Sequence, residues 1–514
     1  MRPLLRFALC CGLPLLLASC RGGPDPSRLI PVSEPPRIDP DYTSLVVPPN
    51  IAPLNFRIRE EGRDYWVRLS SDGAPAVQVH CPEGNCRFDL DTWQEVLARN
   101  RGGRIYLEVF AEQQDGAWRQ YPRITNQVAE EPIDPWIVYR QLAPNSQLTV
   151  IRGIYQRSLE DFDRSPLVTL RDNTFTCVNC HSFHRHDPER FLFHIRGKQA
   201  GTMLVMDGRM RKVETQQGPM FRPLAYSSWH PDGRHVAATL NMYITDFPAT
   251  DLQCPFQAVE KRGDLVVFDT ADNTIHTTSA VFGNEYIETH PSWSADGRSI
   301  YFARCRDRAL LSRGDLAAFR ADLMRIAYDV DTETWGVPET VVAYSEKGKS
   351  CAFPCPSPDG RYVLHILAAK ATFPIYQSSS DIYLLDLVSG EYRRLATVSS
   401  DGADSFARWS SNGRWISLLS SRGDGRSALP YFAYFDTQGE AHKAFVLPQE
   451  DPAYYDTFTD TYNLLELVTS RVKVDPFELA SAMQRPAEPA HFPNAPQVDA
   501  TTAATREALG YPLK

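Results

Sequence analysis

A short turn motif recurs four times in the second half of the chain, and it constrains the fold more than any other feature. The copies read SWHPDGR, SWSADGR, CPSPDGR and RWSSNGR, and they begin at Ser228, Ser292, Cys355 and Arg408. Each copy is followed by a short apolar run. Asp-Gly or Asn-Gly between two strands favours a tight hairpin, because both residues tolerate a positive φ angle. The motif therefore predicts a repeated β-hairpin.

A second hairpin is expected within each repeat, marked by an Asp at the end of an apolar strand. Two hairpins make four strands, and the copies lie roughly 50 to 65 residues apart, somewhat more than a compact four-stranded propeller blade requires. We therefore predict a mainly-β chain with a β-propeller of five to six blades over residues 191–450. The Asp-terminated strands are Leu204–Asp207, Leu265–Asp269, Ile326–Asp329, Ile382–Asp386 and Phe432–Asp436.

The four turn motifs resemble the WD-like repeats of TolB-type β-propellers, in which Trp-Ser-Pro-Asp-Gly-Arg precedes an inner strand. The resemblance covers about half of the chain, and it implies the propeller fold. It implies no function, because propellers serve many unrelated activities.

The first twenty residues indicate export. Two arginines precede an apolar stretch that is too short to span a bilayer and ends in the letters LASC at Cys20. This end resembles a bacterial lipobox, which implies cleavage before Cys20 and lipid on that residue; an ordinary secretory signal cut nearby is the alternative. Arg21 follows, where an Asp would retain a Gram-negative lipoprotein at the inner membrane. We expect a lipid-anchored protein of the cell envelope, at the outer membrane of a Gram-negative bacterium.

The charge of the chain limits its partners. Its 514 residues carry a net charge of −9, which argues against a general electrostatic attraction to nucleic acid or to anionic lipid. We therefore expect no nucleic-acid partner, and we expect the lipid at Cys20 to supply the membrane attachment.

The residues Cys177-Val178-Asn179-Cys180-His181 form a CxxCH motif. Two thiols three residues apart can add to the two vinyl groups of a haem, and the following histidine then binds the iron. This attachment takes place outside the cytoplasm, where the signal sequence directs the chain. We predict haem c bound covalently through Cys177 and Cys180, with His181 as an iron ligand.

Two other interpretations of the CxxCH motif stay open. Zinc could be bound by two thiolates and two imidazoles from Cys177, Cys180, His184 and His186, although no second CxxC completes a four-cysteine site. A disulfide between Cys177 and Cys180 is the third interpretation, because exported proteins meet an oxidising environment.

The surroundings of the motif resemble a family of bacterial surface lipoproteins that join one CxxCH haem motif to TolB-type repeats. This resemblance spans roughly residues 131–470 and implies the architecture and the haem, without a settled activity. The similar stretches are 135–140, 176–183, 191–197, 201–202, 454–456 and 462–468.

The sixth iron ligand has several candidates. His194 is our first choice, because it follows the motif in an apolar, strand-like run. Met203, Met206 and Met210 follow it, and a histidine on an apolar strand is more often a hydrogen-bonded structural residue. An open sixth position would instead favour ligand binding or peroxide chemistry.

The remaining zones of the chain are assigned by composition and by turn signals. A proline-rich run indicates a tether, and short strand-like runs indicate a small β-sandwich. Cys81 and Cys86 flank a Pro-Glu-Gly-Asn turn and form a candidate disulfide. The predicted zones are a signal peptide over 1–19, Cys20 and its tether over 20–43, the β-sandwich over 44–130, the haem segment over 131–190, the propeller over 191–450 and a C-terminal extension over 451–514.

Three functions follow from these observations. The first is a membrane-anchored monohaem cytochrome-like lipoprotein, which transfers electrons to a redox partner protein or senses through its haem. The second is a propeller that binds a surface ligand, namely a protein, peptide or glycan, with a structural metal or disulfide at the CxxCH motif. The third is a haem enzyme with an open iron site. The chain lacks G-x-S-x-G and H-E-x-x-H motifs, which favours an electron carrier or binding protein over an enzyme.

Overall fold

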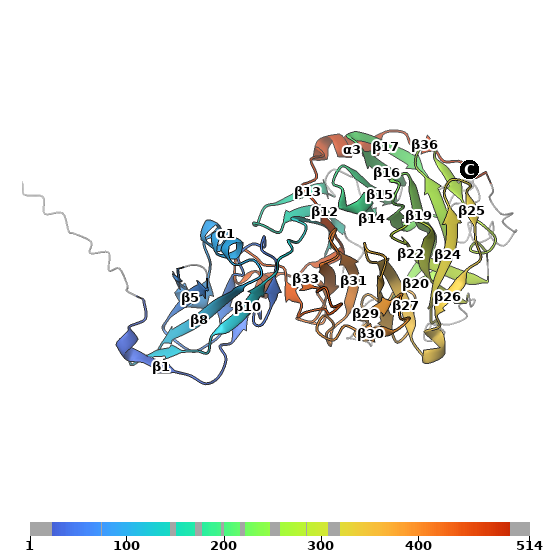
Figure 1. The fold of residues 1–514 in the computed structure, drawn as a ribbon. Helices are drawn as coiled ribbons and strands as arrows, with labels where there is room; N and C mark the ends of the chain where they lie inside the picture. The colour runs from blue at the N-terminus through green and yellow to red at the C-terminus, as the bar shows by residue number, and fades with distance from the viewer. Residues whose placement is uncertain are drawn as a thin grey trace, which may run out of the picture.

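The computed structural model describes most of the chain between residues 23 and 493. The described ranges are 23–72, 75–143, 151–169, 177–196, 200–215, 222–246, 257–283, 285–306 and 319–493. The predicted signal peptide and the lipidation site at Cys20 lie outside them, as does residue 494 onward. Among the described residues, no helix is both long enough and apolar enough to cross a membrane. Figure 1 shows a smaller N-terminal domain beside a larger ring of sheets.

The N-terminal domain consists of a seven-stranded sheet, a three-stranded sheet and the helix α1 (Leu90–Arg99). The Asp89 carboxylate accepts the Thr92 N–H and so caps the first turn of α1. Trp93 and Leu97 on the helix are fully buried in the core shared with the sheets. The strands of the large sheet are β1 (Leu29–Pro31), β3 (Val46–Val47), β5 (Asp64–Ser71), β6 (Val77–His80), β8 (Arg104–Glu112), β9 (Trp118–Gln120) and β10 (Ile124–Val128), and those of the small sheet are β2 (Ile38–Asp39), β4 (Phe56–Ile58) and β7 (Asn85–Cys86).

Part of the tether predicted over 20–43 belongs to this domain, which corrects that prediction. β1 pairs in parallel with β9, and β2 pairs antiparallel with β4. Each short strand supplies hydrogen-bond partners to an otherwise open sheet edge, and this gain outweighs the stiffness that the prolines give the segment.

The candidate disulfide lies in a tight turn of the N-terminal domain. Cys81 and Cys86 are both fully buried and are free thiols in this structure. Burial, together with a hydrogen bond between the two thiols, raises the pKa of Cys86 well above its usual value. The two side chains therefore meet, as the turn predicted, and a covalent bond between them stays a prediction.

The rest of the described chain forms six sheets, each built on four antiparallel strands. The sheets are β35-β11-β12-β13, β14 to β17, β18 to β21, β22 to β25, β27 to β30 and β31 to β34. The strands are β11 (Trp136–Leu142), β12 (Ile151–Ser158), β13 (Arg164–Thr169), β14 (Cys177–Phe183), β15 (Arg190–Arg196), β16 (Gly201–Met206), β17 (Arg209–Glu214), β18 (Leu224–Trp229), β19 (His235–Asp246), β20 (Gln257–Asp269), β21 (Thr274–His276), β22 (Tyr286–Trp293), β23 (Ser299–Arg306), β24 (Asp322–Asp329), β25 (Thr334–Trp335), β26 (Glu339–Val342), β27 (Ser350–Pro356), β28 (Tyr362–Ala368), β29 (Asp381–Asp386), β30 (Tyr392–Arg394), β31 (Asp404–Trp409), β32 (Trp415–Ser420), β33 (Leu429–Tyr434), β34 (Phe445–Val446) and β35 (Thr461–Val468).

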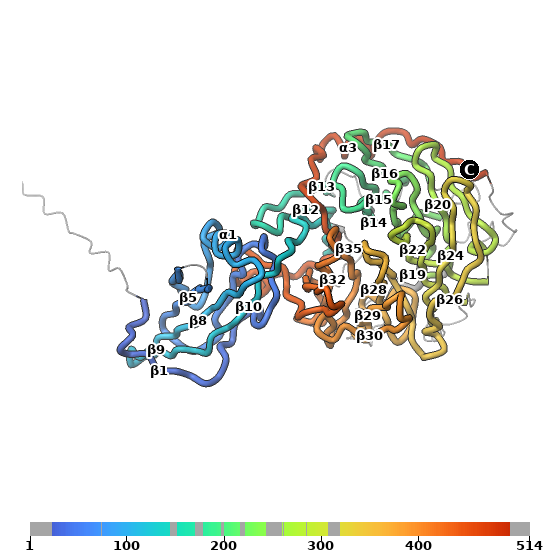
Figure 2. The backbone as a smooth tube through the Cα atoms, in the orientation of Figure 1, coloured from blue at the N-terminus to red at the C-terminus, as the bar shows by residue number. Residues whose placement is uncertain are grey.

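The six sheets close into a β-propeller. Their innermost strands β14, β18, β22, β27, β31 and β35 each contact the next, and β35 returns to β14. β35, near the C-terminus, pairs with β11 from the N-terminal side of the ring, so one sheet joins both ends of the propeller. The tube in Figure 2 shows the orange β35 lying within the body, near β12 and β14.

The predicted propeller boundaries of 191–450 were therefore too narrow. Residues 131–190, expected to be a separate haem segment, contribute β11 to β14, and the predicted C-terminal extension contributes β35. The strands β11, β12 and β13 carry no turn motif. Their membership of the ring follows only from the pairing of β11 with the distant β35. After β35 the chain passes through α3 (Pro476–Gln484), which packs on β13 and β17, and β36 (Glu488–Pro489), which pairs with β17.

The four predicted hairpins are confirmed. In the turn after β22, the Ser294 hydroxyl donates to Asp296 at 2.6 Å and accepts the Ser299 N–H at 3.0 Å. Gly297 then takes a φ angle of 73°, which glycine adopts without a steric penalty. Ser357 with Asp359 and Ser410 with Asn412 repeat the same hydroxyl contact.

The N-terminal domain is attached to the β31 to β34 sheet. The Glu131 carbonyl accepts from Trp415 Nε1 at 3.1 Å, and the Glu131 carboxylate accepts from the Tyr434 hydroxyl at 2.8 Å. Asp134 accepts the Ser411 N–H at 2.7 Å, at the turn between β31 and β32. These contacts hold the segment that leads from the domain, and the domain itself contacts the outer edge of the sheet, where the Tyr42 hydroxyl donates to the Val446 carbonyl at 3.4 Å and Asn55 donates to the Gln449 carbonyl at 3.1 Å.

Ring closure gives the first prediction. A chain that ends at Asp460 lacks β35 and leaves the edge of β11 unpaired, so we expect it to lose the cooperative thermal transition of the full chain, followed by circular dichroism. A chain that ends at Ser470 keeps β35 but lacks α3, and it serves as the control. If both shortened chains melt alike, β35 is not what holds the ring closed.

Candidate functional site

The CxxCH motif forms the inner strand β14 of a propeller sheet. β14 pairs with β15, with Cys177 opposite Arg196 and Asn179 opposite His194. Three residues along an extended strand span about 10 Å. The motif therefore runs along the strand rather than folding into the compact turn that would bring two thiols to one porphyrin edge.

Cys180 occupies a position that recurs in every sheet of the ring. Each innermost strand has a β-bulge at which one non-glycine residue takes a positive φ angle, 50° at Cys180. Cys180 belongs to a buried cluster that contains three of the equivalent residues, Phe353, Phe406 and Leu464. The backbone at Cys180 therefore has a structural explanation that is independent of any cofactor. The residues at this position are Cys180, Tyr226, His290, Phe353, Phe406 and Leu464.

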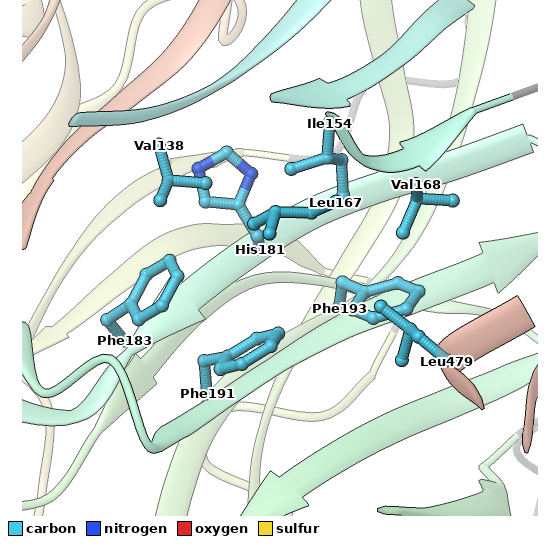
Figure 3. A pocket seen from close by; sticks show the side chains of 9 residues that line it. All are labelled: Val138, Ile154, Leu167, Val168, His181, Phe183, Phe191, Phe193 and Leu479. Carbon is cyan, nitrogen blue, oxygen red and sulfur yellow. The ribbon is translucent and has the colours of Figure 1, made fainter. Parts of the chain in front are cut away.

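His181 lies in a different environment from Cys180. It is 2% exposed and faces a cavity of about 10 Å³ between the β14 sheet and the β11 to β13 strands (Figure 3). Every other wall residue is apolar. These residues are Val138, Ile154, Leu167, Val168, Phe183, Phe191, Phe193 and Leu479.

The His181 imidazole is held neutral and without a hydrogen bond of normal geometry at either ring nitrogen. Burial lowers its pKa to about 3, and the nearby Arg140 charge adds to this effect, while the Val138 backbone opposes it. A buried polar group without a partner is costly in an apolar region, and each such group in a native protein requires an explanation. The ring nitrogens of His181 are thus buried polar atoms that the fold leaves without a hydrogen bond of normal geometry.

The described form of β14 does not fit a covalently bound haem. Cys180 points into the central cluster while His181 points between two sheets, so one porphyrin cannot contact both. A ligand of that size also needs a cavity on the order of 300 Å³ or more, against about 10 Å³ beside His181. The side chain of Cys177 lies outside what the structure describes.

The alternative zinc ligands are not brought together either. His184 and His186 form a turn beyond the far end of β14 from Cys177. The His184 ring contacts the Pro231 carbonyl at 3.1 Å, and the His186 ring contacts the Leu467 carbonyl at 2.8 Å.

His194, the predicted distal ligand, lies on the other face of its sheet. Phe193 lines the cavity beside His181, and the next residue along β15 therefore points the opposite way. His194 is buried, with its ring nitrogens 3.0 Å from the Thr202 hydroxyl and 2.8 Å from the Ser227 hydroxyl. This arrangement gives His194 a structural role and argues against the predicted role as a ligand opposite His181.

A buried polar cluster near the ring axis was not predicted from the sequence. Glu260 accepts hydrogen bonds from Asn241 at 2.5 Å and Thr289 at 2.7 Å, and burial raises its pKa to about 7. His290 stacks on Phe353 with ring centres 3.7 Å apart, and its two nitrogens make no hydrogen bond. Asn241, Glu260 and Thr289 lie beside β-bulges. The positions of these bulges cannot be predicted from the apolar pattern of the strands.

A polar pocket of about 330 Å³ opens between the β27 to β30 and β31 to β34 sheets. Three loops form it, joining β28 to β29, β30 to β31 and β32 to β33. These loops lie on the face of the ring where the inner strands begin, opposite the Asp-Gly turns. The residues that line it are Tyr376, Ser378, Asp401, Gly402, Ala403, Ser421, Asp424, Gly425 and Arg426.

The chain matches no known family model and no curated protein. A solved TolB-type protein from Agrobacterium tumefaciens is 14% identical, with a TM-score of 0.33 over 64% of this chain and 97% of that one. Hydrazine synthase from Kuenenia stuttgartiensis is 14% identical, with a TM-score of 0.31 over 51% and 64%. A luciferin-regenerating enzyme is 11% identical, with a TM-score of 0.37 over 61% and 91%. Scores this low add no argument, so the propeller assignment rests on sheet order and ring closure.

The unused imidazole gives the second prediction. We expect His181→Leu to raise the free energy of unfolding at pH 7 by about 1–3 kcal/mol, because it removes two buried polar atoms without partners. The unfolded histidine takes up a proton below its usual pKa of 6.5, whereas the folded one does so only near 3. Wild-type stability should therefore fall as the pH drops through this window, by up to about 1.4 kcal/mol per pH unit.

Urea unfolding at pH 7 and pH 5 tests this prediction. The gap between His181→Leu and the wild type should widen at pH 5. If His181→Leu is less stable than the wild type at pH 7, the prediction is wrong and the imidazole makes a favourable interaction in the folded protein.

Proposed function

We propose that this chain is a membrane-tethered β-propeller that binds a small, uncharged polar ligand, with a saccharide as the favoured class. The pocket of about 330 Å³ between two propeller sheets carries this proposal. Its size falls within the range of small-molecule sites in proteins. Lipid at Cys20 would hold the protein at the cell envelope.

The lining of the pocket suits a molecule with several hydroxyl groups. The carboxylates of Asp401 and Asp424 can accept hydrogen bonds from hydroxyls, and the half-buried Tyr376 offers an aromatic surface for the apolar face of a sugar ring. Asp424 is fixed in its loop, since it accepts the backbone N–H groups of Arg426 at 2.8 Å and Ser427 at 2.7 Å. The pocket contains two carboxylates, Asp401 and Asp424, and one guanidinium, Arg426. This net negative charge disfavours an anionic ligand.

Calorimetric titration with neutral oligosaccharides and with their uronic acid counterparts tests the proposal. We expect a neutral member to bind, and we expect Tyr376→Ala and Asp401→Asn each to weaken it by about tenfold, which is about 1.4 kcal/mol. Glu391→Gln, an exposed change on the opposite face, is the matched control. The proposal fails if no saccharide binds, or if the pocket variants bind as well as the control.

Covalent haem at Cys177 and Cys180 is the second candidate function, as part of a cytochrome-like electron carrier with a redox partner protein. The observation that favours it is the neutral His181 imidazole, whose ring nitrogens have no hydrogen-bond partner. Against it stand the extended β14 and the small cavity, so haem attachment would require β14 to leave its place in the ring.

A pyridine haemochrome spectrum separates the two candidates. The protein is exported with its own sequence from residue 21 in cells that attach c-type haem, beside a Cys177→Ala, Cys180→Ala double variant. We expect neither protein to show a Soret band that survives denaturation. A band in the wild type that the double variant lacks would overturn this expectation and establish the cytochrome.

A further inference from the structure

One turn of the propeller brings two histidines and an aspartate together. It joins β18 to β19, on the opposite face of the ring from the saccharide pocket, and contains His230, Asp232 and His235. His230 Nδ1 lies 3.0 Å from one Asp232 carboxylate oxygen, and His235 Nδ1 lies 2.6 Å from the other. All three ligand atoms are within 4.8 Å of one another. The histidines are buried, whereas Asp232 is exposed.

The Nε2 atom of His230, which points away from Asp232, faces a hydrogen-bond acceptor. His230 Nε2 is 3.1 Å from the Gly297 carbonyl, so this nitrogen carries the proton and Nδ1 carries the lone pair. His235 differs from His230: its Nδ1 lies 2.6 Å from the Asp232 carboxylate and so carries a proton that this carboxylate accepts, while its Nε2 is 3.6 Å from the nearest oxygen of the buried Asp269, beyond hydrogen-bond distance. Histidines that bind metals usually donate their other N–H to a carbonyl or carboxylate, which fixes the ring in this way.

The Nδ1 atoms of the two imidazoles and one carboxylate therefore converge on a single point. The lone pair of His230 Nδ1 and the Asp232 oxygen 3.0 Å from it repel one another unless a cation lies between them. The backbone N–H of Asp232 also approaches His230 Nδ1, at 3.1 Å. A metal would replace that hydrogen bond and the one from His235 Nδ1 to Asp232, whose proton would leave to solvent, while the backbone N–H groups of Arg234 and His235 continue to hold the Asp232 carboxylate.

The other turns show that the histidines are not needed for the hairpin. Where this turn has His230, the equivalent turns have Ser294, Ser357 and Ser410, whose hydroxyls contact the turn Asp or Asn. Where it has His235, they have Ser299, Tyr362 and Trp415. The chain thus contains natural versions of the same turn without either imidazole.

We propose that His230, Asp232 and His235 bind a divalent metal ion, for which zinc is the best-suited ion. Two imidazoles and a carboxylate are typical zinc ligands, and the exposed position of Asp232 leaves a fourth position for water. This site uses none of the residues of the saccharide pocket or of the CxxCH motif, so it does not depend on the proposed function.

Zinc titration of the full chain tests the site, in a background with Cys177→Ser and Cys180→Ser that removes the alternative thiolate ligands. The variants are His230→Ser, His235→Ser and Asp232→Asn; each puts in place a residue that another turn of this chain already carries. The control is Asp296→Asn, the same change in a turn without histidines. We expect one equivalent of zinc and a higher melting temperature with zinc than with EDTA.

The variants decide the outcome. Each should weaken zinc binding by at least about tenfold while keeping the melting temperature of the parent in EDTA, and the control should bind as the parent does. Zinc binding that is unchanged in all three variants would place the metal elsewhere and overturn the proposal. A parent that binds no zinc at millimolar concentrations would show that only a proton sits between these groups.

Discussion

The pairing of β11 with β35 is the interaction on which the rest of the structure depends. It runs from the pair Trp136 and Val468 to the pair Leu142 and Thr461, with one bulge between them, so the two ends of the ring share a sheet. A ring of sheets that is not closed would leave one inner strand with unpaired backbone groups and one sheet face without a neighbour. Closure also fixes what is attached at the seam, since the N-terminal domain enters just before β11 and α3 packs on β13 just after β35.

Closure of the ring brings six inner strands to one axis, and each of these strands contains the same β-bulge. A non-glycine residue with a positive φ angle costs about 1 kcal/mol, yet every inner strand has one. The gain is burial at the axis, where Tyr226, His290 and Phe353 pack with ring centres 3.7 to 5.8 Å apart. Cys180 takes the equivalent position in β14, so the ring determines where this thiol points. The CxxCH sequence is therefore compatible with an inner strand of the propeller as well as with a haem motif.

Sequence alone was sufficient where the signal is local. The Asp-Gly turns predicted the hairpins and the propeller, because the conformation of a turn is set by its own residues. The β14 to β15 turn was missed as a further copy, because Arg185 and His186 take the positive φ angles that glycine takes elsewhere. The sheet that joins both ends of the ring was missed because its inner strand β35 lies more than three hundred positions after β11, with which it pairs.

The candidate site was harder to predict, because it depends on which face of a strand each residue occupies. An apolar run predicts that His194 is buried, but it does not say that Phe193 and His194 face different sheets. The polar pocket was missed for another reason. Its residues come from three loops that share no motif and meet only when two sheets pack side by side. His184 and His186 were noticed, but as partners of Cys177, from which an extended strand separates them.

The two faces of the propeller carry different groups of side chains. The face with the Asp-Gly turns carries the His230 turn, and at Ser411 it also bonds to the segment that leads from the N-terminal domain. The pocket lies at the other end of the same β31 to β34 sheet. The N-terminal domain runs along the outer edge of this sheet and also reaches its pocket end, where Asn55 donates to the Gln449 carbonyl at 3.1 Å and Arg87 pairs with Asp451 at 3.0 Å.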